Sequence, residues 1–276
     1  MVVVDKAPGI AVIADRWDDS KERLDELLNA YFAKDADTAA KDADTAAHET
    51  PPRQPRVPFP HKVFVVHRID KDTSGLVIFA KHAEAHRNLS ALFESRSVGK
   101  TYIAIVHGRP SWEETVCDLP LRADGDREHR TVIDKRLGKS ALTRFKLLGT
   151  EGNYSVVEAS PQSGRTHQIR VHLTSLGYPI VCDPLYGSPK PVLLSSFKRG
   201  YRGDRETELP ILSRLGLHAA RLELPGLSAP EAPGPDGKDG AERIAFAAPF
   251  PRDMGALIRQ LEKSADENFG LDEYYS

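Results

Sequence analysis

The stretch HRIDKDTSGLVIFAK, residues 67–81, joins charged residues and a turn to an apolar run. The five apolar residues 76–80 are typical of a buried strand. Asp70 stands just before them, between a His-Arg pair and a Thr-Ser-Gly turn, which is an unusual place for a carboxylate. Because Asp accepts backbone hydrogen bonds where a chain reverses, this stretch alone indicates a turn cap. A chemical role for Asp70 needs evidence from elsewhere in the chain.

The composition is that of an ordinary soluble globular protein. A chain of 276 residues with 40% hydrophobic content can bury a full core, in one large domain or two small ones. No apolar run approaches the roughly 20 residues needed to cross a bilayer. The start, MVVVDKAPG, lacks the basic n-region and the long apolar h-region of a signal peptide. We therefore expect a cytoplasmic protein. Cys117 and Cys182 lie far apart without partner spacing, which predicts two buried free thiols.

The charge of the chain is unevenly distributed. The formal net charge is −2, but residues 61–261 carry 29 basic and 23 acidic side chains, a net charge of +6. Because phosphate binding needs local Lys and Arg rather than a basic whole, a nucleic-acid partner is compatible with this chain. A solvated charged surface explains the same numbers.

Two segments have the composition of flexible insertions. In residues 34–60 the sequence KDADTAA occurs twice in tandem and a proline-rich stretch follows. A solenoid needs at least three longer units, so we interpret this duplication as loop expansion. Residues 225–240, PGLSAPEAPGPDGKDG, have a similar linker composition. We predict one domain over residues 1–276 that is interrupted by these two insertions.

Strands and helices alternate irregularly along the rest of the chain. Apolar and alternating patterns predict strands at residues 2–4, 76–80, 102–106, 141–148, 154–159, 221–224 and 243–248. Helical spacing predicts helices at residues 21–32, 82–96, 168–176 and around 254–261, the third ending at Gly177 with Pro179 beyond. Since most strands are not joined by βαβ crossovers, the pattern indicates an α+β fold.

The helix that begins near residue 168 has a basic start. Arg165, His167, Arg170 and His172 lie there with no acid among them. The free N–H groups of a helix N-terminus suit an anion, which could be a phosphate or Asp70 itself. The histidines also raise a metal alternative, and His82 and His86 even have i, i+4 spacing. Without a nearby Glu or a third ligand that spacing is weak, so we expect no metal site.

Several segments together resemble the RluA-type pseudouridine synthases. HRIDKDTSG is similar to the family's HRLD-x-x-TSG signature, GRTHQIRVHLTSLGYPIVCDPLYG to its second long motif, and KTYIAIVHG to its K-x-Y strand, in the expected order. LGKSALTRF and LGLHAARLEL also match, so the resemblance covers most of the chain. It implies the pseudouridine synthase fold, a single α+β catalytic domain with a mixed, mainly antiparallel central sheet flanked by helices and loops.

The resemblance also implies the chemistry. The family members are isomerases that detach uracil from its ribose, rotate it and reattach it through carbon 5, without metal or cofactor. Asp70 would be the nucleophile, which must stay ionised in a largely dry pocket. Arg165 would be its cationic partner, since a nearby cation favours the ionised form. Tyr102 would pack against the target uracil, although a core tyrosine on an alternating strand is the structural alternative.

Further positions are expected to contact the RNA. Arg68 would fill the space left by the extruded nucleotide, because extrusion costs a few kcal/mol that other contacts must offset. Thr73, His167 and Arg170 belong to the two long motifs. In residues 190–205, basic and aromatic side chains alternate in a way that suits phosphates and unstacked bases, although a charged surface loop is an equal alternative. The cations expected to bind substrate in this segment are Lys198, Arg199 and Arg202.

The sequence also departs from the family pattern. The first motif usually reads N-K-P-x-G, whereas this chain has DKAPG at residues 5–9, a change that concerns a turn more than chemistry. We expect no separate N-terminal RNA-binding domain and a monomer. The RNA is either transfer or ribosomal RNA, and nothing specifies the uridine. A non-catalytic RNA-binding module and a metal-dependent hydrolase are the alternatives from other classes.

Overall fold

The computed structural model describes residues 1–14, 22–45, 62–226 and 243–275. Its helices are α1 (Leu24–Thr45), α2 (Ala83–Glu94), α3 (Gln168–Ser175) and α4 (Arg252–Ala265), with short 3-10 turns at Leu194–Ser196 and Asp272–Tyr274. Its strands are β1 (Val2–Lys6), β2 (Phe64–Val65), β3 (Ser74–Ala80), β4 (Gly99–His107), β5 (Glu114–Cys117), β6 (Leu121–Arg122), β7 (Val132–Ile133), β8 (Thr143–Glu151), β9 (Tyr154–Pro161), β10 (Leu217–Leu224) and β11 (Ile244–Ala247).

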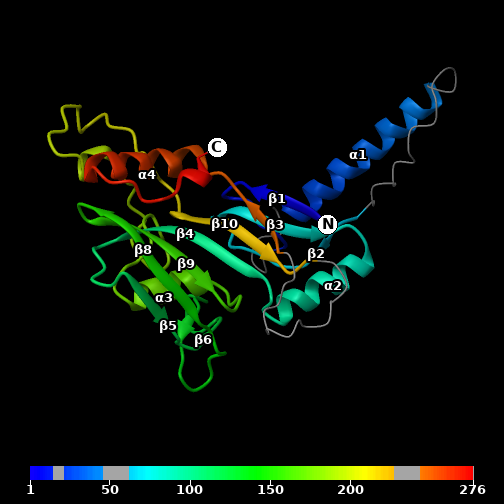
Figure 1. Ribbon diagram of the computed structural model, residues 1–276, viewed down its shortest axis with the longest axis horizontal. Helices are drawn as coiled ribbons and strands as arrows, with labels where there is room; N and C mark the ends of the chain where they lie inside the picture. Colours follow the sequence, from blue (N-terminus) through cyan, green and yellow to red (C-terminus); the bar gives the residue numbers. More distant parts are fainter. Residues whose placement is uncertain (15–21, 46–61, 227–242, 276) are drawn as a thin grey trace, which may run out of the picture.

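One twisted sheet organises these elements. Its strands run in the order β1-β3-β10-β4-β9-β8-β5, with β2 paired to β3 and β11 paired to β10 (Figure 1). The pair β3–β10 is parallel, and the other paired strands of the described sheet are antiparallel. A separate two-stranded sheet joins β6 to β7. The prediction of an α+β fold with a mixed, mainly antiparallel sheet is therefore confirmed.

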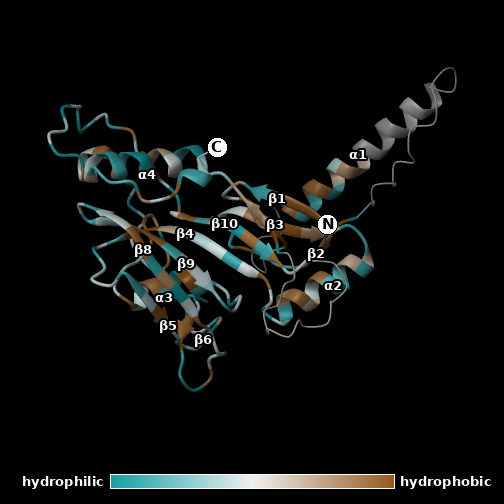
Figure 2. Cartoon of the chain, viewed as in Figure 1, coloured by the Kyte–Doolittle hydropathy of each residue, from teal (hydrophilic) through white to brown (hydrophobic). Residues whose placement is uncertain are grey.

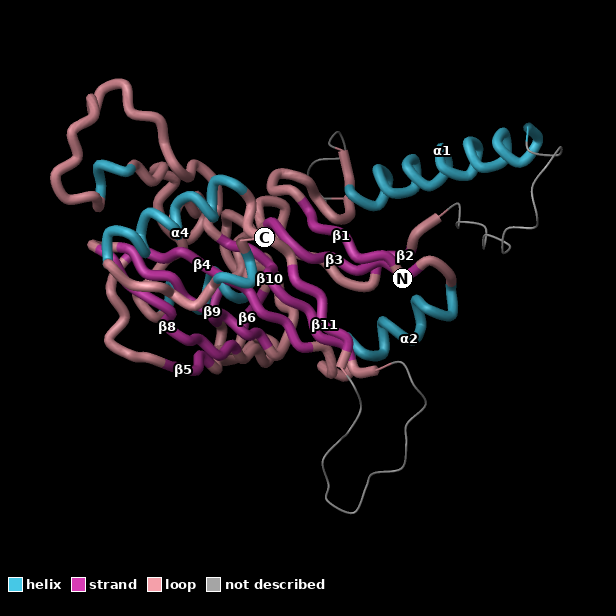
Figure 3. Tube along the Cα trace, turned by 45° about the horizontal axis from the view of Figure 1, so that its top comes forward, coloured by secondary structure: helices cyan, strands magenta, loops and turns pink. Residues whose placement is uncertain are grey.

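Helices cover both faces of the sheet. Alternate residues of β4 and β9 face opposite sides: one set packs under α4 with Met254 and Leu257, and the other packs against Ile169 and Leu173 of α3. The side chains of β3 also alternate between the two faces of the sheet. The start of α1 packs on one face of this strand, and α2 packs on the other. Figure 2 shows hydrophobic residues along β3 and at the base of α1, and Figure 3 shows the rest of α1 projecting from the sheet. The candidate site described below lies on the α3 face.

Gly75, the second residue of β3, lies at a position where the structure requires glycine. Its φ is +105°, and a β-carbon at this position would overlap the backbone of Ala219 on β10. Gly75 lies opposite Ala219, which in turn lies opposite Tyr102 on β4. This register across three strands brings the turn that carries Asp70 toward Tyr102, because neighbouring strands are only about 4.8 Å apart.

The other predicted elements are confirmed with one correction. The helix expected at residues 21–32 is α1, but it continues to Thr45, so residues 34–45 of the expected insertion are helical. The reason is local, because nearly half of the repeat is Ala, which favours helix, and the repeat has no Gly or Pro. The rest of that expected insertion, residues 46–61, lies outside the described residues, as do residues 227–242. Cys117 and Cys182 are buried free thiols, as predicted. No described helix is long and apolar enough to span a bilayer.

Candidate active site

A pocket of about 530 Å³ lies where the 67–73 segment, the end of α2, the start of β4 and the loop into α3 meet. It falls in the size range of small-molecule sites. Seven of the ten residues that the sequence assigned to the site line it: Arg68, Asp70, Thr73, Tyr102, Arg165, His167 and Arg170.

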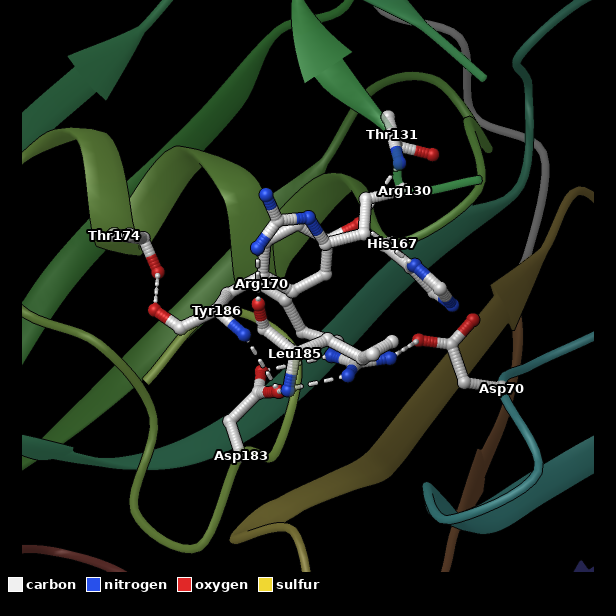
Figure 4. Close-up of polar contacts among 9 residues, drawn as sticks. All are labelled: Asp70, Arg130, Thr131, His167, Arg170, Thr174, Asp183, Leu185 and Tyr186. Carbon is white, nitrogen blue, oxygen red and sulfur yellow. Dashed lines mark hydrogen bonds and ion pairs between the residues drawn. The ribbon is translucent and has the colours of Figure 1, made fainter. Parts of the chain in front are cut away.

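Asp70 is paired with Arg170 inside this pocket (Figure 4). The Nη1 atom of Arg170 lies 3.3 Å from Oδ2 of Asp70, whose side chain is 20% exposed. On its other side Arg170 donates from Nε and Nη2 to the two carboxylate oxygens of Asp183, both at 2.8 Å. Asp183 is fully buried and also accepts from the backbone N–H groups of Leu185 and Tyr186. Arg170 is thereby held rigidly with one N–H group turned toward Asp70.

The geometry corrects the partner expected for Asp70. Arg165 lines the pocket, but its Nε donates to the carbonyl oxygen of Ser140 at 3.2 Å, and the cation that contacts Asp70 is Arg170. The physical reason is the helix: Arg165 precedes α3, whereas Arg170 is its third residue and faces Asp183 on the turn that follows. Arg170 had been expected only as an RNA contact.

The two carboxylates act strongly on Arg170. Burial alone would lower the pKa of the guanidinium, but the hydrogen bonds of Asp183 and the charge of Asp70 outweigh burial and raise it. For Asp183 burial acts to raise the pKa, while the hydrogen bonds and charge of Arg170 lower it below its usual value. Arg170 is consequently a permanent cation. Two carboxylates around one guanidinium leave the cluster with a net negative charge.

A hydrogen-bonded chain orients His167 beside the pair. The Tyr186 hydroxyl oxygen accepts from the backbone N–H of Thr131 at 2.9 Å and lies 2.9 Å from Nδ1 of His167. When the hydroxyl hydrogen donates to Nδ1, a neutral His167 carries its proton on Nε2. Burial lowers the pKa of His167, which favours the neutral ring. Figure 4 shows the ring directed toward Asp70, so Nε2–H is a donor on the pocket side.

Tyr102 lies at the junction of two core clusters and also lines the pocket. Burial, and then the negative charge of Asp70, raise the pKa of its hydroxyl well above the usual value. The ring therefore stays neutral and presents a flat surface near the carboxylate. Both the packing role and the structural role proposed for Tyr102 are compatible with this position.

The DKAPG segment supports the turn that carries Asp70. Lys6 is buried and donates from Nζ to the carbonyl oxygens of Ala7 and Lys71 at 2.9 and 2.7 Å. Gly9 donates its N–H to the same Lys71 oxygen. Burial lowers the pKa of Lys6 to about 8, while Asp72 and Asp70 oppose this shift. The segment thus acts on the backbone of the turn, in keeping with its interpretation as a turn motif.

Thr73 and Arg68 occupy different positions at the pocket. Thr73 donates its backbone N–H to the Asp70 carbonyl, and its buried hydroxyl has no hydrogen-bond partner among the described residues. A buried hydroxyl without a partner costs free energy, so a ligand atom is a plausible acceptor or donor for it. Arg68 is exposed at the rim. Both residues line the pocket.

The structure does not bring the 190–205 segment to this pocket. Phe197 is buried against Tyr154, with ring centroids 5.7 Å apart, in the core cluster that contains α4. That cluster lies on the sheet face opposite α3. Phe197 is therefore a core residue and not a free stacking platform. Lys198, Arg199 and Arg202 are exposed beside it, and none of the three lines the pocket.

The expected histidines have structural contacts. His82 caps α2 by accepting from the backbone N–H of Ala85, and His86 contacts the carbonyl oxygen of Val65. His172 is fully buried between Thr143 and Leu119. Within the described ranges, no group of three or more His, Cys, Asp or Glu side chains is placed to hold a metal ion.

Sequence reasoning missed Asp183 and Tyr186. Both lie in the CDPLYG stretch, which the motif comparison included without assigning roles to its residues. The sequence did contain a signal for Asp183. A helix start with two arginines and no acid needs a carboxylate from elsewhere, and CDPLYG supplies Asp183 shortly after the apolar residues PIV. Tyr186 also stacks against Arg170, whose guanidinium carbon lies 5.1 Å from the ring centroid.

Comparison with known proteins gives a consistent result. Residues 1–175 match the family described as RNA pseudouridylate synthase. An uncharacterized RNA pseudouridine synthase from Chloroflexus aurantiacus is 40% identical over 202 residues, which cover 73% of this chain and 54% of that protein. Ribosomal large subunit pseudouridine synthase D from Zymomonas mobilis is 36% identical over 201 residues, covering 71% of this chain and 56% of that protein. This chain thus matches only about half the length of these relatives.

A solved structure shares the fold. Human RNA Pseudouridylate Synthase Domain Containing 4 superposes with a TM-score of 0.61 at 21% identity, over 94% of this chain and 89% of the human one. At that identity the likeness concerns the arrangement of strands and helices alone.

Proposed function

This chain belongs to the RNA pseudouridylate synthase family, and we propose that it isomerises specific uridines of a structured RNA to pseudouridine with Asp70 as the nucleophile. The observation that carries the proposal is the pair of Asp70 with the buried, doubly held Arg170 in one pocket with Tyr102. Relatives named for the ribosomal large subunit make ribosomal RNA the first candidate, with transfer RNA second.

The geometry supports a reactive carboxylate. A nucleophile must be ionised, and the Nη1 atom of Arg170 lies 3.3 Å from a carboxylate oxygen of Asp70. The same guanidinium is already neutralised by Asp183 through two shorter hydrogen bonds. Asp70 consequently keeps much of its negative charge and its nucleophilicity, because its cationic partner is shared.

The reaction breaks the bond between uracil N1 and ribose C1′ and forms a bond between C5 and C1′, while C5 loses a proton and N1 gains one. An attack of Asp70 on the uracil ring and an attack on the ribose both need an ionised carboxylate in a pocket that excludes most water. Tyr102 is placed to pack on the uracil while it turns, and its hydroxyl is a candidate to assist removal of the C5 proton. Nε2–H of His167 is a candidate donor to a uracil carbonyl.

The test is a map of pseudouridines across total RNA from cells with and without the gene. We expect one or a few sites to be lost in the deletion and to be restored by the wild-type gene but not by Asp70→Asn. The Asn side chain is nearly isosteric and a much poorer nucleophile, so RNA binding should survive the change. An unchanged map, or restoration by the Asn variant after deamidation to Asp is excluded, would refute the proposal.

A metal-dependent hydrolase has no candidate ligand set in the described part of the chain. A non-catalytic RNA-binding module predicts that Asp70→Asn changes nothing in the map. The same experiment therefore separates the module from the enzyme.

A further inference from the structure

A second part of the pocket wall is positively charged. Arg96 and Lys100 form this wall between the end of α2 and the loop that leads into α3. Arg96 is exposed, whereas Lys100 is partly buried, and its Nζ donates to the carbonyl oxygen of Ser163 at 3.3 Å, a long contact for an ammonium group. Among the described residues no carboxylate lies within ion-pair distance of Lys100 or Arg96.

An ammonium group that is partly removed from water and has no counter-ion is unfavourable. Taking the charge out of water costs free energy that an anion or several hydrogen bonds would have to offset. Burial, and secondly the charge of Arg96, lower the pKa of Lys100 to about 8. Lys100 in turn acts on His67, whose pKa is lowered to about 3, mainly by burial. Glu94 also lines the pocket but is exposed and is not among the charges that act on Lys100.

Arg96 occupies a strained backbone position. It follows Ser95, the C-cap of α2, and has φ of +60°, in the left-handed region where helices usually place glycine. The N–H groups of Arg96 and Ser97 bond back to Phe93 and Leu92, as in a Schellman motif. Glycine would close this helix end with less strain but would remove a cation from the pocket. Strain of this kind is found at ligand sites, where the side chain is needed.

Two adjacent cations without a carboxylate, one partly buried and one exposed in a strained backbone position, make this wall suited to an anion. We propose that Lys100 and Arg96 bind a phosphate of the RNA backbone next to the target uridine. The pocket of about 530 Å³ is continuous from Asp70 to Lys100, so a nucleotide with its base at Tyr102 can place a flanking phosphate at this wall. The proposal rests on the proposed function, because RNA is taken as the ligand.

The test compares two probes that differ in one charge. The first is the dinucleotide UpU, and the second is its methylphosphonate analogue, in which a methyl group replaces a charged oxygen. Both carry a 2′-O-methyl group on the 5′ nucleoside, which keeps the analogue stable. For the full chain we expect UpU to bind about tenfold more tightly than the analogue. Lys100→Met should weaken the binding of UpU but not of the analogue, so that the two affinities become similar. Lys100→Arg should keep most of the difference between the two affinities.

Arg96→Gly separates binding from folding. Because glycine relieves the strain at φ +60°, this variant should melt at a higher temperature while the difference between the two probes becomes smaller. Lys263→Met on α4 is the matched control, since it removes an exposed lysine from the opposite face of the sheet. It should leave the difference unchanged.

The pH dependence gives an independent reading. The phosphodiester of UpU stays charged over the whole pH range of the titration. If the difference in affinity between UpU and its analogue disappears as the pH rises through and above about 8, the loss reports the deprotonation of Lys100. Lys100→Arg should show no such loss, because Arg stays charged. Equal affinity of the wild type for both probes, including no binding of either, overturns the phosphate site. So does a Lys100→Met variant that weakens both probes equally. Neither result depends on turnover, so they are distinct from a failure of the pseudouridine map.

Discussion

The buried carboxylate Asp183 should contribute far more to stability than the proposed nucleophile Asp70, although both contact the same guanidinium. The perturbation is Asp183→Asn, which keeps the shape but removes the charge. The Asn amide would turn at least one N–H group toward the N–H groups of Arg170 or toward the amides of Leu185 and Tyr186. Arg170 would then be a buried cation with only Asp70 as a partner.

The magnitude follows from the contacts. Arg170 and Asp183 have side chains that are 6% and 0% exposed and share two hydrogen bonds of 2.8 Å. Hydrogen bonds between charged groups are worth about 1.5–3 kcal/mol each, and removing one partner of a buried pair typically costs about 3–5 kcal/mol. We therefore expect Asp183→Asn to lower the free energy of unfolding by roughly 3–5 kcal/mol. Asp70→Asn removes one contact of 3.3 Å at a 20% exposed carboxylate and should cost about 1 kcal/mol or less.

The assay is equilibrium unfolding in urea, followed by circular dichroism, for the wild type and both variants. Glu26→Gln, at an ion pair with 59% exposure of the carboxylate, is the control for loss of a surface pair and should change little. In an Arg170→Met background Asp183→Asn should cost much less, because the charge it would leave unpaired is gone. Similar losses for Asp70→Asn and Asp183→Asn, or a loss below about 1 kcal/mol for Asp183→Asn, would contradict this reasoning.

Four further predictions follow from the same contacts. Tyr186→Phe removes the hydroxyl that holds His167, so ¹⁵N NMR should show both neutral tautomers of His167 where the wild type shows Nε2–H alone, and an unaltered spectrum would contradict the hydrogen-bonded chain. Tyr102→Phe keeps the packing ring but loses the hydroxyl; an intermediate should accumulate in single-turnover experiments, whereas normal rates would leave only packing. The pKa of Asp183 is lowered on folding, so its ionised carboxylate stabilises the folded state above its unfolded pKa near 3.8, and this contribution is lost as pH falls below that value. The free energy of unfolding should therefore fall less steeply with decreasing pH for Asp183→Asn than for the wild type. Alanine at Lys198, Arg199, Arg202 and Arg205 should weaken RNA binding and make its dependence on salt concentration shallower. The rate of pseudouridine formation in RNA that is already bound should not change, because this segment lies outside the pocket. An unchanged salt slope would show that the segment does not contact the RNA.

Local patterns in the sequence were sufficient for most of the secondary structure and for the position of Asp70. Apolar runs and helical spacing located the main strands and helices, because burial imposes a period of 2 or 3.6 on the residues themselves. The Thr-Ser-Gly turn marked where β3 approaches β10 closely, since glycine is needed there. Composition misjudged residues 34–45, where a low-complexity repeat of good helix formers continues α1.

The ion pairs of the site were decided only by tertiary structure. Asp70 and Arg170 are separated by 100 positions, and Asp183 joins them from the turn after α3. Arg165 and Arg170 look equivalent in sequence, because both lie near the start of α3. Arg165 precedes the helix and donates to a backbone carbonyl, whereas Arg170 lies on the first turn between two carboxylates. The side of the sheet that carries residues 190–205 was equally hidden, because the burial of Phe197 under α4 depends on how the strands are ordered. Contacts of this kind depend on the relative placement of whole elements, which no local period encodes.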